Sequence, residues 1–157
     1  SVPALKWIRP VVLIAAPERR NLMTDTTASP TNPPSEFPYD THLDILHGPH
    51  EIIDVPALVA ACTHPWWNQT LCKVNESVVR LGVVQGEYHW HHHDDEDEFF
   101  FVLEGEWIID LEGRSVTLTP GQGYVVPKGV RHRPRAPKRT VILMVEGAGI
   151  VPTGDAA

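Results

Sequence analysis

The chain is poor in cysteine and methionine, with two of each among its 157 residues. Cys62 and Cys72 lie too far apart in the sequence to form a Cys-x-x-Cys motif of the kind found in redox and zinc sites. We therefore expect two buried, reduced thiols. A disulfide framework and a thiol-based catalytic site are both disfavoured.

Long apolar runs are also absent, since no stretch approaches the roughly 20 residues that a membrane-spanning helix requires. Residues 6–16 place basic residues ahead of an apolar run, as a signal peptide does. However, Pro10 and Pro17 bracket that run, and no small-residue cleavage site follows it. Met23 begins a more ordinary N-terminal sequence. The sequence thus predicts a cytoplasmic protein without a membrane anchor, in which residues 1–22 are an upstream extension.

Positive charge is scarce as well. Thirteen Lys and Arg stand against twenty Asp and Glu, for a net charge of −7, and this balance disfavours nucleic acid as a partner. Six of the basic residues fall within residues 128–139 and could attract an anionic substrate. Strand alternation instead puts Arg131, Arg133 and Arg135 on the face opposite His132, so we favour a solvated or interface row.

A chain of 157 residues with 42% apolar content suits a single domain. Residues 24–38 are rich in Thr, Ser, Pro and Asn and nearly lack apolar side chains. We therefore predict a flexible N-terminal extension over residues 1–38 and one domain over residues 39–157.

The domain carries the signals of an all-β protein. Residues 43–46 and 52–53 suggest edge strands, and residues 55–62 suggest one short helix beginning near Pro56. From about residue 71, alternating segments are punctuated by Gly and Pro, and Glu104-Gly105 suggests a tight hairpin. The further strands are expected at residues 76–84, 87–93, 98–103, 106–111, 115–119, 124–126 and 140–145. Some eight short strands predict an antiparallel sandwich or small barrel.

One stretch of this domain has the residue types of a metal site. His91 and His93 are two positions apart, so on a strand both imidazoles project from one face. A tight turn over residues 94–97 would return Glu98 on the paired strand, facing the same interior, and His132 follows a Pro-x-Gly turn downstream. Three imidazoles and one carboxylate are a transition-metal ligand set.

These two segments resemble the paired motifs of the cupin superfamily. Residues matching the first motif are His91, His93, Glu98 and Gly105, and those matching the second are Gly121, Pro127, Gly129 and His132. Two positions depart from the pattern: Gly86 stands one residue closer to His91 than the motif has it, and Ala136 replaces an Asn. The resemblance implies a double-stranded β-helix, or jelly-roll, barrel with its core at about residues 71–146.

The ligand set predicts the chemistry in outline. One divalent transition metal is expected, with Fe or Mn favoured and Ni, Co, Cu or Zn as alternatives. Four protein ligands leave two positions of an octahedral site open to a small oxygen-containing substrate or O₂. A metal-dependent enzyme follows, and dioxygenase-type oxidation is favoured over an isomerase or lyase. A non-catalytic module that binds a small molecule or a metal is the alternative from a different class.

Several neighbours could take part in this chemistry. His89 shares the face of the ligand histidines and is a pocket or catalytic candidate. Tyr124 is a candidate general acid or base, and it ranks above Tyr88, which alternates out of phase with the ligands. Trp66 and Trp67 are expected in the core, at a dimer interface or in the wall of the substrate pocket.

The remaining features near the site point outward. Trp90 and His92 should lie on the face opposite the ligands, and the acidic residues 94–97 are expected to form a solvated turn. An outward-facing Trp90 together with the apolar pieces in residues 43–53 predicts a homodimer.

Overall fold

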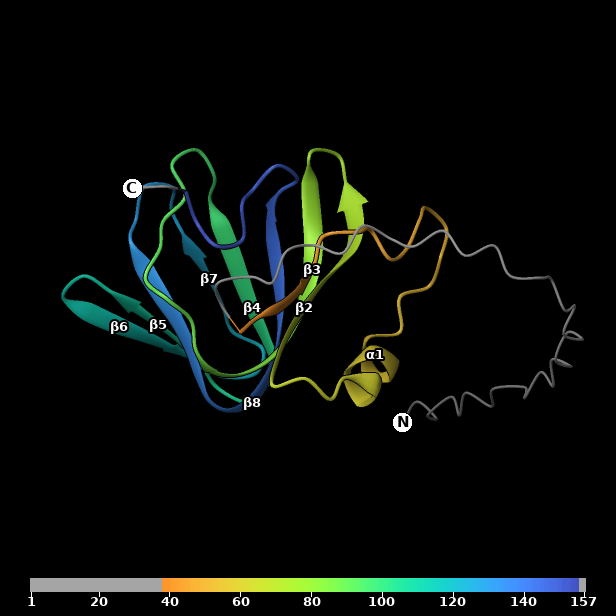
Figure 1. Cartoon of the computed structure of the whole chain (residues 1–157), viewed down its shortest axis with the longest axis horizontal. Helices are drawn as coiled ribbons and strands as arrows, with labels where there is room; N and C mark the ends of the chain where they lie inside the picture. The colour runs from red at the N-terminus through yellow and green to blue at the C-terminus, as the bar shows by residue number, and fades with distance from the viewer. Residues whose placement is uncertain (1–37, 156–157) are drawn as a thin grey trace, which may run out of the picture. The chain divides into compact units, whose positions relative to one another are not determined.

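The computed structural model describes residues 38–155, and the account below concerns that part of the chain. The predicted extension, residues 1–38, lies outside the described residues except for Pro38. Eight strands and one short helix are present in the described part (Figure 1). In chain order they are β1 (Asp40–His42), α1 (Val55–Ala61), β2 (Trp66–Val74), β3 (Ser77–Glu87), β4 (Glu98–Glu104), β5 (Trp107–Leu111), β6 (Arg114–Leu118), β7 (Gly123–Val126) and β8 (His132–Gly147).

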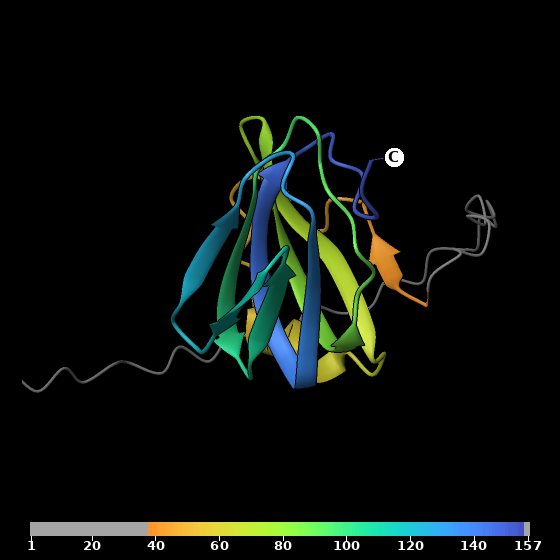
Figure 2. The ribbon, with the colours of Figure 1, turned by 90° about the vertical axis from the view of Figure 1, so that its left-hand side faces the viewer.

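The long strand β8 organises the sheet. Its second half pairs with both β3 and β4, and its first residues pair with β5, all in antiparallel fashion. The strand order is β1-β2-β3-β8-β4-β7. Outside this order, β5 pairs with β8 and β6 pairs with β5. Figure 2 shows the strands wrapping around an enclosed interior. The predicted all-β jelly-roll fold is confirmed.

Strand alternation divides the apolar residues between two clusters. The cluster inside the barrel includes Trp66, Phe100, Trp107 and Ile142. A second cluster forms outside the sheet, where α1 and neighbouring loop residues cover the outward face of β2 and β3; its members include Leu71, Leu81, Val141, Leu58 and Trp67. The interior cluster therefore lines the space in which a site can be built.

The predicted short helix is confirmed at Val55–Ala61. The Asp54 side chain accepts a hydrogen bond from the N–H of Ala57 at 3.1 Å, which satisfies a free donor at the helix N-terminus. Pro56 sits in the first turn, where its missing N–H costs nothing. Cys62, which follows the helix, and Cys72 are both free thiols, but each is only partly buried rather than buried as predicted.

The predicted edge strands at residues 43–46 and 52–53 are wrong. The chain there is irregular, although the N–H groups of Leu46 and His47 donate to the carbonyls of Thr70 and Leu71 beside β2. A Gly-Pro pair and the positive φ of His50 (68°) prevent a regular ladder from continuing. The strand that does pair with β2 is β1, in parallel orientation.

The predicted strand at residues 87–93 is also wrong, because β3 ends at Glu87 and only an isolated bridge between His91 and His132 follows. Glu98 does not return on a hairpin with the histidine segment. It begins β4, which pairs with β7 and β8. Spacing along the chain identified these residues, but the predicted pairing between them was incorrect.

Further boundaries differ from the prediction, the largest difference being β8, which spans His132–Gly147 where a strand at residues 140–145 was expected. Glu104-Gly105 does turn the chain, but the turn does not make a hairpin. The strands before and after it, β4 and β5, pair with different parts of β8. The barrel starts earlier than residue 71, because β2 begins at Trp66 and pairs with β3 from that residue onward.

Candidate metal centre

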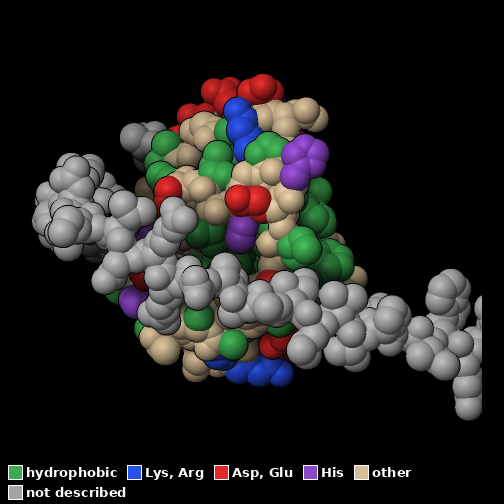
Figure 3. All heavy atoms as spheres, turned by 90° about the vertical axis from the view of Figure 1, so that its right-hand side faces the viewer, with side chains coloured by type: hydrophobic (Ala, Val, Ile, Leu, Met, Phe, Trp, Pro, Cys, Tyr) green, Lys and Arg blue, Asp and Glu red, His purple; other side chains and the backbone are tan. Residues whose placement is uncertain are grey.

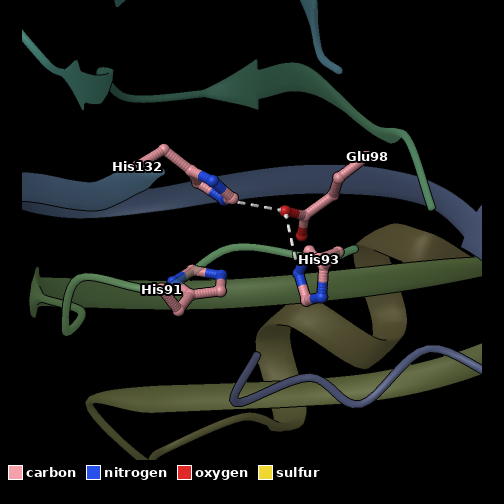
Figure 4. A group of neighbouring side chains, drawn as sticks. All are labelled: His91, His93, Glu98 and His132. Carbon is pink, nitrogen blue, oxygen red and sulfur yellow. Dashed lines mark hydrogen bonds and ion pairs between the residues drawn. The ribbon is translucent and has the colours of Figure 1, made fainter. Parts of the chain in front are cut away.

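Three separate parts of the chain bring the four predicted ligands together. His91 and His132 exchange two backbone hydrogen bonds, of 3.0 and 2.9 Å, and the carbonyl of His93 accepts from the N–H of Gly129 at 2.6 Å. Glu98 faces inward as the first residue of β4. Figure 4 shows the four side chains converging from these elements.

The distances between the side chains fit one metal ion. Each of His91, His93, Glu98 and His132 is buried, and they offer ligand atoms that all lie within 4.8 Å of one another. Glu98 Oε2 is 3.1 Å from Nε2 of His132 and 3.7 Å from Nε2 of His93. Metal bonds of about 2.0–2.2 Å space adjacent ligands about 3 Å apart and opposite ones about 4.3 Å apart. Small side-chain rotations would therefore close this set around an ion.

Backbone carbonyls orient two of the imidazoles. Nδ1 of His91 lies 3.1 Å from the carbonyl of His89, and Nδ1 of His132 lies 3.0 Å from that of Val130. A carbonyl oxygen can only accept a hydrogen bond, so each Nδ1 must carry the hydrogen. Each Nε2 is then left with its lone pair directed into the cluster, as metal ligation requires.

His93 supports the same interpretation through its unsatisfied atoms. Neither of its ring nitrogens has a hydrogen-bond partner among residues 38–155, although the side chain is 3% exposed. Buried polar atoms normally find a partner, and an orphaned one needs an explanation. A metal bound at a ring nitrogen supplies it.

Burial and mutual charges shift the pKa values of the group. Burial alone would raise the pKa of Glu98, but the close approach of His132 and His93 and the charges of His132 and His91 lower it to about 2. Burial, reinforced by the charge of His132, lowers the pKa of His91 to about 3. Glu98 is therefore ionised and His91 neutral at pH 7, which are the protonation states that bind metal.

A cavity inside the barrel adjoins this cluster. Its volume is about 30 Å³, and its mouth is open. His91 and Glu98 belong to its wall, and Trp66, Phe100 and Trp107 supply an aromatic lining. A small organic molecule in this space would lie directly against the cluster.

The other residues predicted to line a pocket lie in different places, and only some of them line the cavity. Trp66 lines the cavity, whereas Trp67 points the opposite way and packs in the outer cluster beside α1, as alternation along β2 dictates. Tyr124 is not a lining residue, because its hydroxyl accepts a hydrogen bond from Arg114 at 3.0 Å near the surface. His89 stacks on the ring of Tyr88 with centroids 4.4 Å apart, and its Nε2 lies 2.7 Å from the carbonyl of Thr153.

Tyr88 does line the cavity, contrary to its lower sequence ranking. The ranking assumed strand alternation, but residues 88–93 are not a strand, so alternation does not apply there. Its hydroxyl donates to the carbonyl of Pro152 at 3.0 Å, and burial raises its pKa above the usual range. The group is therefore a proton-bearing hydroxyl at neutral pH.

Sequence analysis missed a buried ion pair in the cavity wall. The guanidinium of Arg80 donates from Nε to Asn68 and from Nη1 to Glu146, both at 2.9 Å. Burial, then the charge of Glu98, raises the pKa of Glu146 to about 7, while Arg80 opposes this shift. The available signal was alternation along residues 78–84, which places a charged residue on the interior face of an apolar strand.

A C-terminal segment, residues 148–155, covers the histidine segment. The N–H of Asp155 donates to the carbonyl of His92 at 3.0 Å, and the Asp155 carboxylate accepts from the N–H of Asp94 at 2.7 Å. Gly154 has φ +89°, and a Cβ there would lie 2.6 Å from Cβ of His91. This segment therefore packs directly on a metal-ligand candidate.

The outer surface near the site carries separated charges. Acidic side chains gather at the upper end of the face shown in Figure 3. The turn before β3 and residues 94–97 lie at that end in Figure 1. Outside the barrel, Arg131 and Arg133 each lie 5.6 Å from the ring centroid of Trp90. The arginine row thus faces away from the cavity.

The comparisons with known proteins agree with this geometry. The family model of the cupin domain matches residues 78–146. Protein YdbB of Bacillus subtilis is 48% identical over 80 residues, which span 50% of this chain and 71% of that protein.

No helix within residues 38–155 is long and apolar enough to cross a membrane.

Solved structures match as well. A cupin-2 domain protein of Shewanella frigidimarina is 33% identical with a TM-score of 0.59, covering 61% of this chain and 94% of that one. Protein NMB1881 of Neisseria meningitidis is 31% identical with a TM-score of 0.56, covering 62% and 99% respectively. The chain belongs to the cupin superfamily, and it carries the three-histidine, one-glutamate cluster that suits a metal in this fold.

Proposed function

We propose that this cupin is a metal-dependent enzyme that acts on a small oxygen-containing organic molecule. The observation that carries the proposal is the joint presence of four buried donor atoms within 4.8 Å of one another and a cavity against them. A site that served structure alone would not need an adjoining cavity with an open mouth.

The residues present would hold one divalent transition metal, for which Fe or Mn suits the mixed nitrogen and oxygen ligand set. When bound, such an ion polarises an oxygen of the substrate and can take part in redox chemistry. The carbonyls of His89 and Val130 keep the imidazoles oriented. The aromatic wall excludes water, and the Tyr88 hydroxyl holds a proton at the edge of the cavity.

Among reaction classes, we favour oxygen-dependent oxidation. Four protein ligands leave two positions of an octahedral ion for substrate and O₂ together. A non-oxidative isomerase or lyase is the second candidate, because polarising a substrate oxygen is sufficient for that chemistry. Turnover that persists under strict anaerobiosis would favour this second candidate.

Metal analysis of purified variants tests the ligand assignment. We expect about one metal ion per chain in the unmodified protein, and at least a tenfold loss of metal affinity in His93→Ala and in His132→Ala. His92→Ala is the matched control, since the His92 side chain faces Asp94, 3.2 Å away, outside the cluster. Loss of metal from the control but not from His93→Ala would refute the assignment.

Oxygen uptake and product formation, measured with a panel of small carbonyl, hydroxyl and carboxylate compounds, test the enzymatic part. We expect turnover by the unmodified protein and His92→Ala, and none by His93→Ala. Full metal occupancy without turnover of any compound would instead support a non-catalytic binding module.

A further inference from the structure

The cavity contains a buried cation that the metal cluster does not use. Arg80 is 1% exposed and is the only Lys or Arg among the described residues that line the cavity. It projects from β3 at the position paired with Met144 of β8, and Met144 also lines the cavity. An arginine in such a place must have its charge and its donors satisfied by the surroundings.

Its donors are only partly satisfied. Nε donates to Asn68 and Nη1 donates to Glu146. Nη2 is buried and has no hydrogen-bond partner among residues 38–155. A buried charged donor without a partner is destabilising, so an acceptor is expected to complete the guanidinium when the cavity is filled.

The arginine and the metal cluster share one wall of the barrel. Phe99 of β4 pairs with Val145 of β8, so Glu98 and Glu146 are the next residues along these neighbouring strands. Glu146 in turn binds Arg80 at 2.9 Å. The order along the wall is therefore metal cluster, Glu146 and Arg80, and one small molecule can face both ends.

The charges indicate the sign of that molecule. A divalent ion and Arg80 together contribute +3, and ionised Glu98 contributes −1. Glu146 contributes at most −1, because its pKa is raised to about 7. At least one positive charge remains uncompensated in the cavity, and the single negative charge of a carboxylate balances it when Glu146 is ionised.

We propose that the cavity binds a small organic monocarboxylate, with its carboxylate accepting a hydrogen bond from Nη2 of Arg80 and its adjoining oxygen facing the metal centre. The charge balance in this inference rests on the proposed function because it counts the metal ion, whereas the unpartnered Nη2 of Arg80 is independent of it. The cavity is small, about 30 Å³, and open at its mouth, so the substrate carries few carbon atoms. Arg80 is accordingly a residue that determines specificity.

Calorimetric titration of the Mn²⁺-loaded protein tests the charge preference. The probes are glycolate and pyruvate, their neutral amides glycolamide and pyruvamide, and inorganic phosphate. We expect each carboxylate to bind at least about tenfold more tightly than its amide, and phosphate to bind more weakly than either carboxylate. Equal affinity for acid and amide, or no binding of either, would overturn the proposal.

Variants assign the preference to Arg80. The double variant Arg80→Met, Glu146→Gln removes both charges of the pair, so that no lone charge is left buried. It should keep its metal and lose the preference for acid over amide. Glu146→Gln alone should bind carboxylates at least as tightly as the unmodified protein, because it removes a negative charge and keeps the arginine.

Arg131→Met is the matched control, since it makes the same chemical change on an arginine outside the barrel. It should retain the full preference, and a preference that survives in the double variant would refute the role of Arg80. Titrations of the metal-free protein separate the two proposals. A chain that binds no metal but still prefers the acids would refute the proposed function and support the Arg80 site.

Discussion

Gly105 illustrates how a single residue fixes the path of the barrel. Its φ is +88°, a left-handed conformation that residues with a side chain rarely adopt. A Cβ at this position would also lie 2.8 Å from the carbonyl oxygen of Arg139 and would contact the hydroxyl of Thr140 even more closely. Both backbone conformation and space therefore require glycine where β4 gives way to β5.

Gly105→Ala should lower the free energy of unfolding by roughly 2–5 kcal/mol, because conformational strain adds to the clash with β8. Gly113 is a matched control, with φ +82° and no atom within 4 Å of its Cβ position. Gly113→Ala should cost only the strain, about 1–2 kcal/mol. Urea unfolding of both variants measures the difference, and equal losses would show that the clash is relieved without cost.

At this scale the sequence predicted the residues of the metal cluster but not the arginine beside it. His91, His93 and Glu98 lie close together in the chain, so spacing alone brought them into one hypothesis. Arg80 and Glu146 are 66 positions apart, and their contact depends on the register between β3 and β8. No local pattern encodes that register, so the ion pair could not be predicted.

Among the elements, β8 has the largest structural role, since three strands pair with it. Asp110 of β5 reinforces one of these pairings by accepting hydrogen bonds from Arg133, its cross-strand partner, and from Arg135. The hydrogen bond from Arg135, against the opposing effect of burial and with help from Ser115 and Arg133, holds the pKa of Asp110 well below its usual range.

A carboxylate whose pKa is lower in the folded than in the unfolded protein stabilises the fold at pH values above the unfolded pKa, which is near 3.9 for Asp. This stabilisation disappears as the pH falls further. Asp110→Asn should therefore lower stability by roughly 1–3 kcal/mol at pH 7 and flatten the loss of stability below about pH 4. Denaturant unfolding at several pH values between roughly 2.5 and 7, a range that spans the unfolded pKa of Asp, measures both effects.

The control for that prediction is Glu87→Gln, because Glu87 pairs with Arg133 through a side chain that is 63% exposed. An exposed ion pair contributes at most about 1 kcal/mol, so this variant should stay close to the unmodified protein at every pH. An Asp110→Asn variant with an unchanged acid profile would contradict the role given to Asp110.

Strands were predicted correctly where alternating apolar and polar residues form a continuous hydrogen-bonded ladder with a neighbouring strand, as in β3, β4 and β6. It failed at residues 87–93, because that segment is held by the bridge between His91 and His132 and by the turn at Gly129 rather than by a strand partner. The same failure placed Tyr124 ahead of Tyr88. Whether an alternating segment becomes a strand depends on a partner that its own residues do not specify.

For the whole molecule, metal binding should contribute to stability, because an ion ties the histidine segment and Glu98 to His132, which lies 34 positions beyond Glu98 in the chain. A ligand present at about a thousand times its dissociation constant stabilises the native state by about 4 kcal/mol. Removal of the metal by chelation should therefore lower Tm by about 10 °C or more, and adding metal back should restore it.

Differential scanning calorimetry of the loaded and chelated protein tests this expectation. His93→Ala should show little response to metal, whereas His92→Ala should respond as the unmodified protein does. An unmodified protein whose Tm ignores both chelator and metal would show that the cluster holds no ion.

The close packing of Gly154 on His91 should affect the rate of metal exchange rather than the affinity for the metal. The C-terminal segment closes over the histidine segment through hydrogen bonds to His92 and Asp94, and all four candidate ligands are buried beneath the surface. A chelator too large for the mouth of the cavity would reach an ion there only when this segment lifts. The rate of metal exchange would then be set by that local opening, and it would level off as the chelator concentration rises.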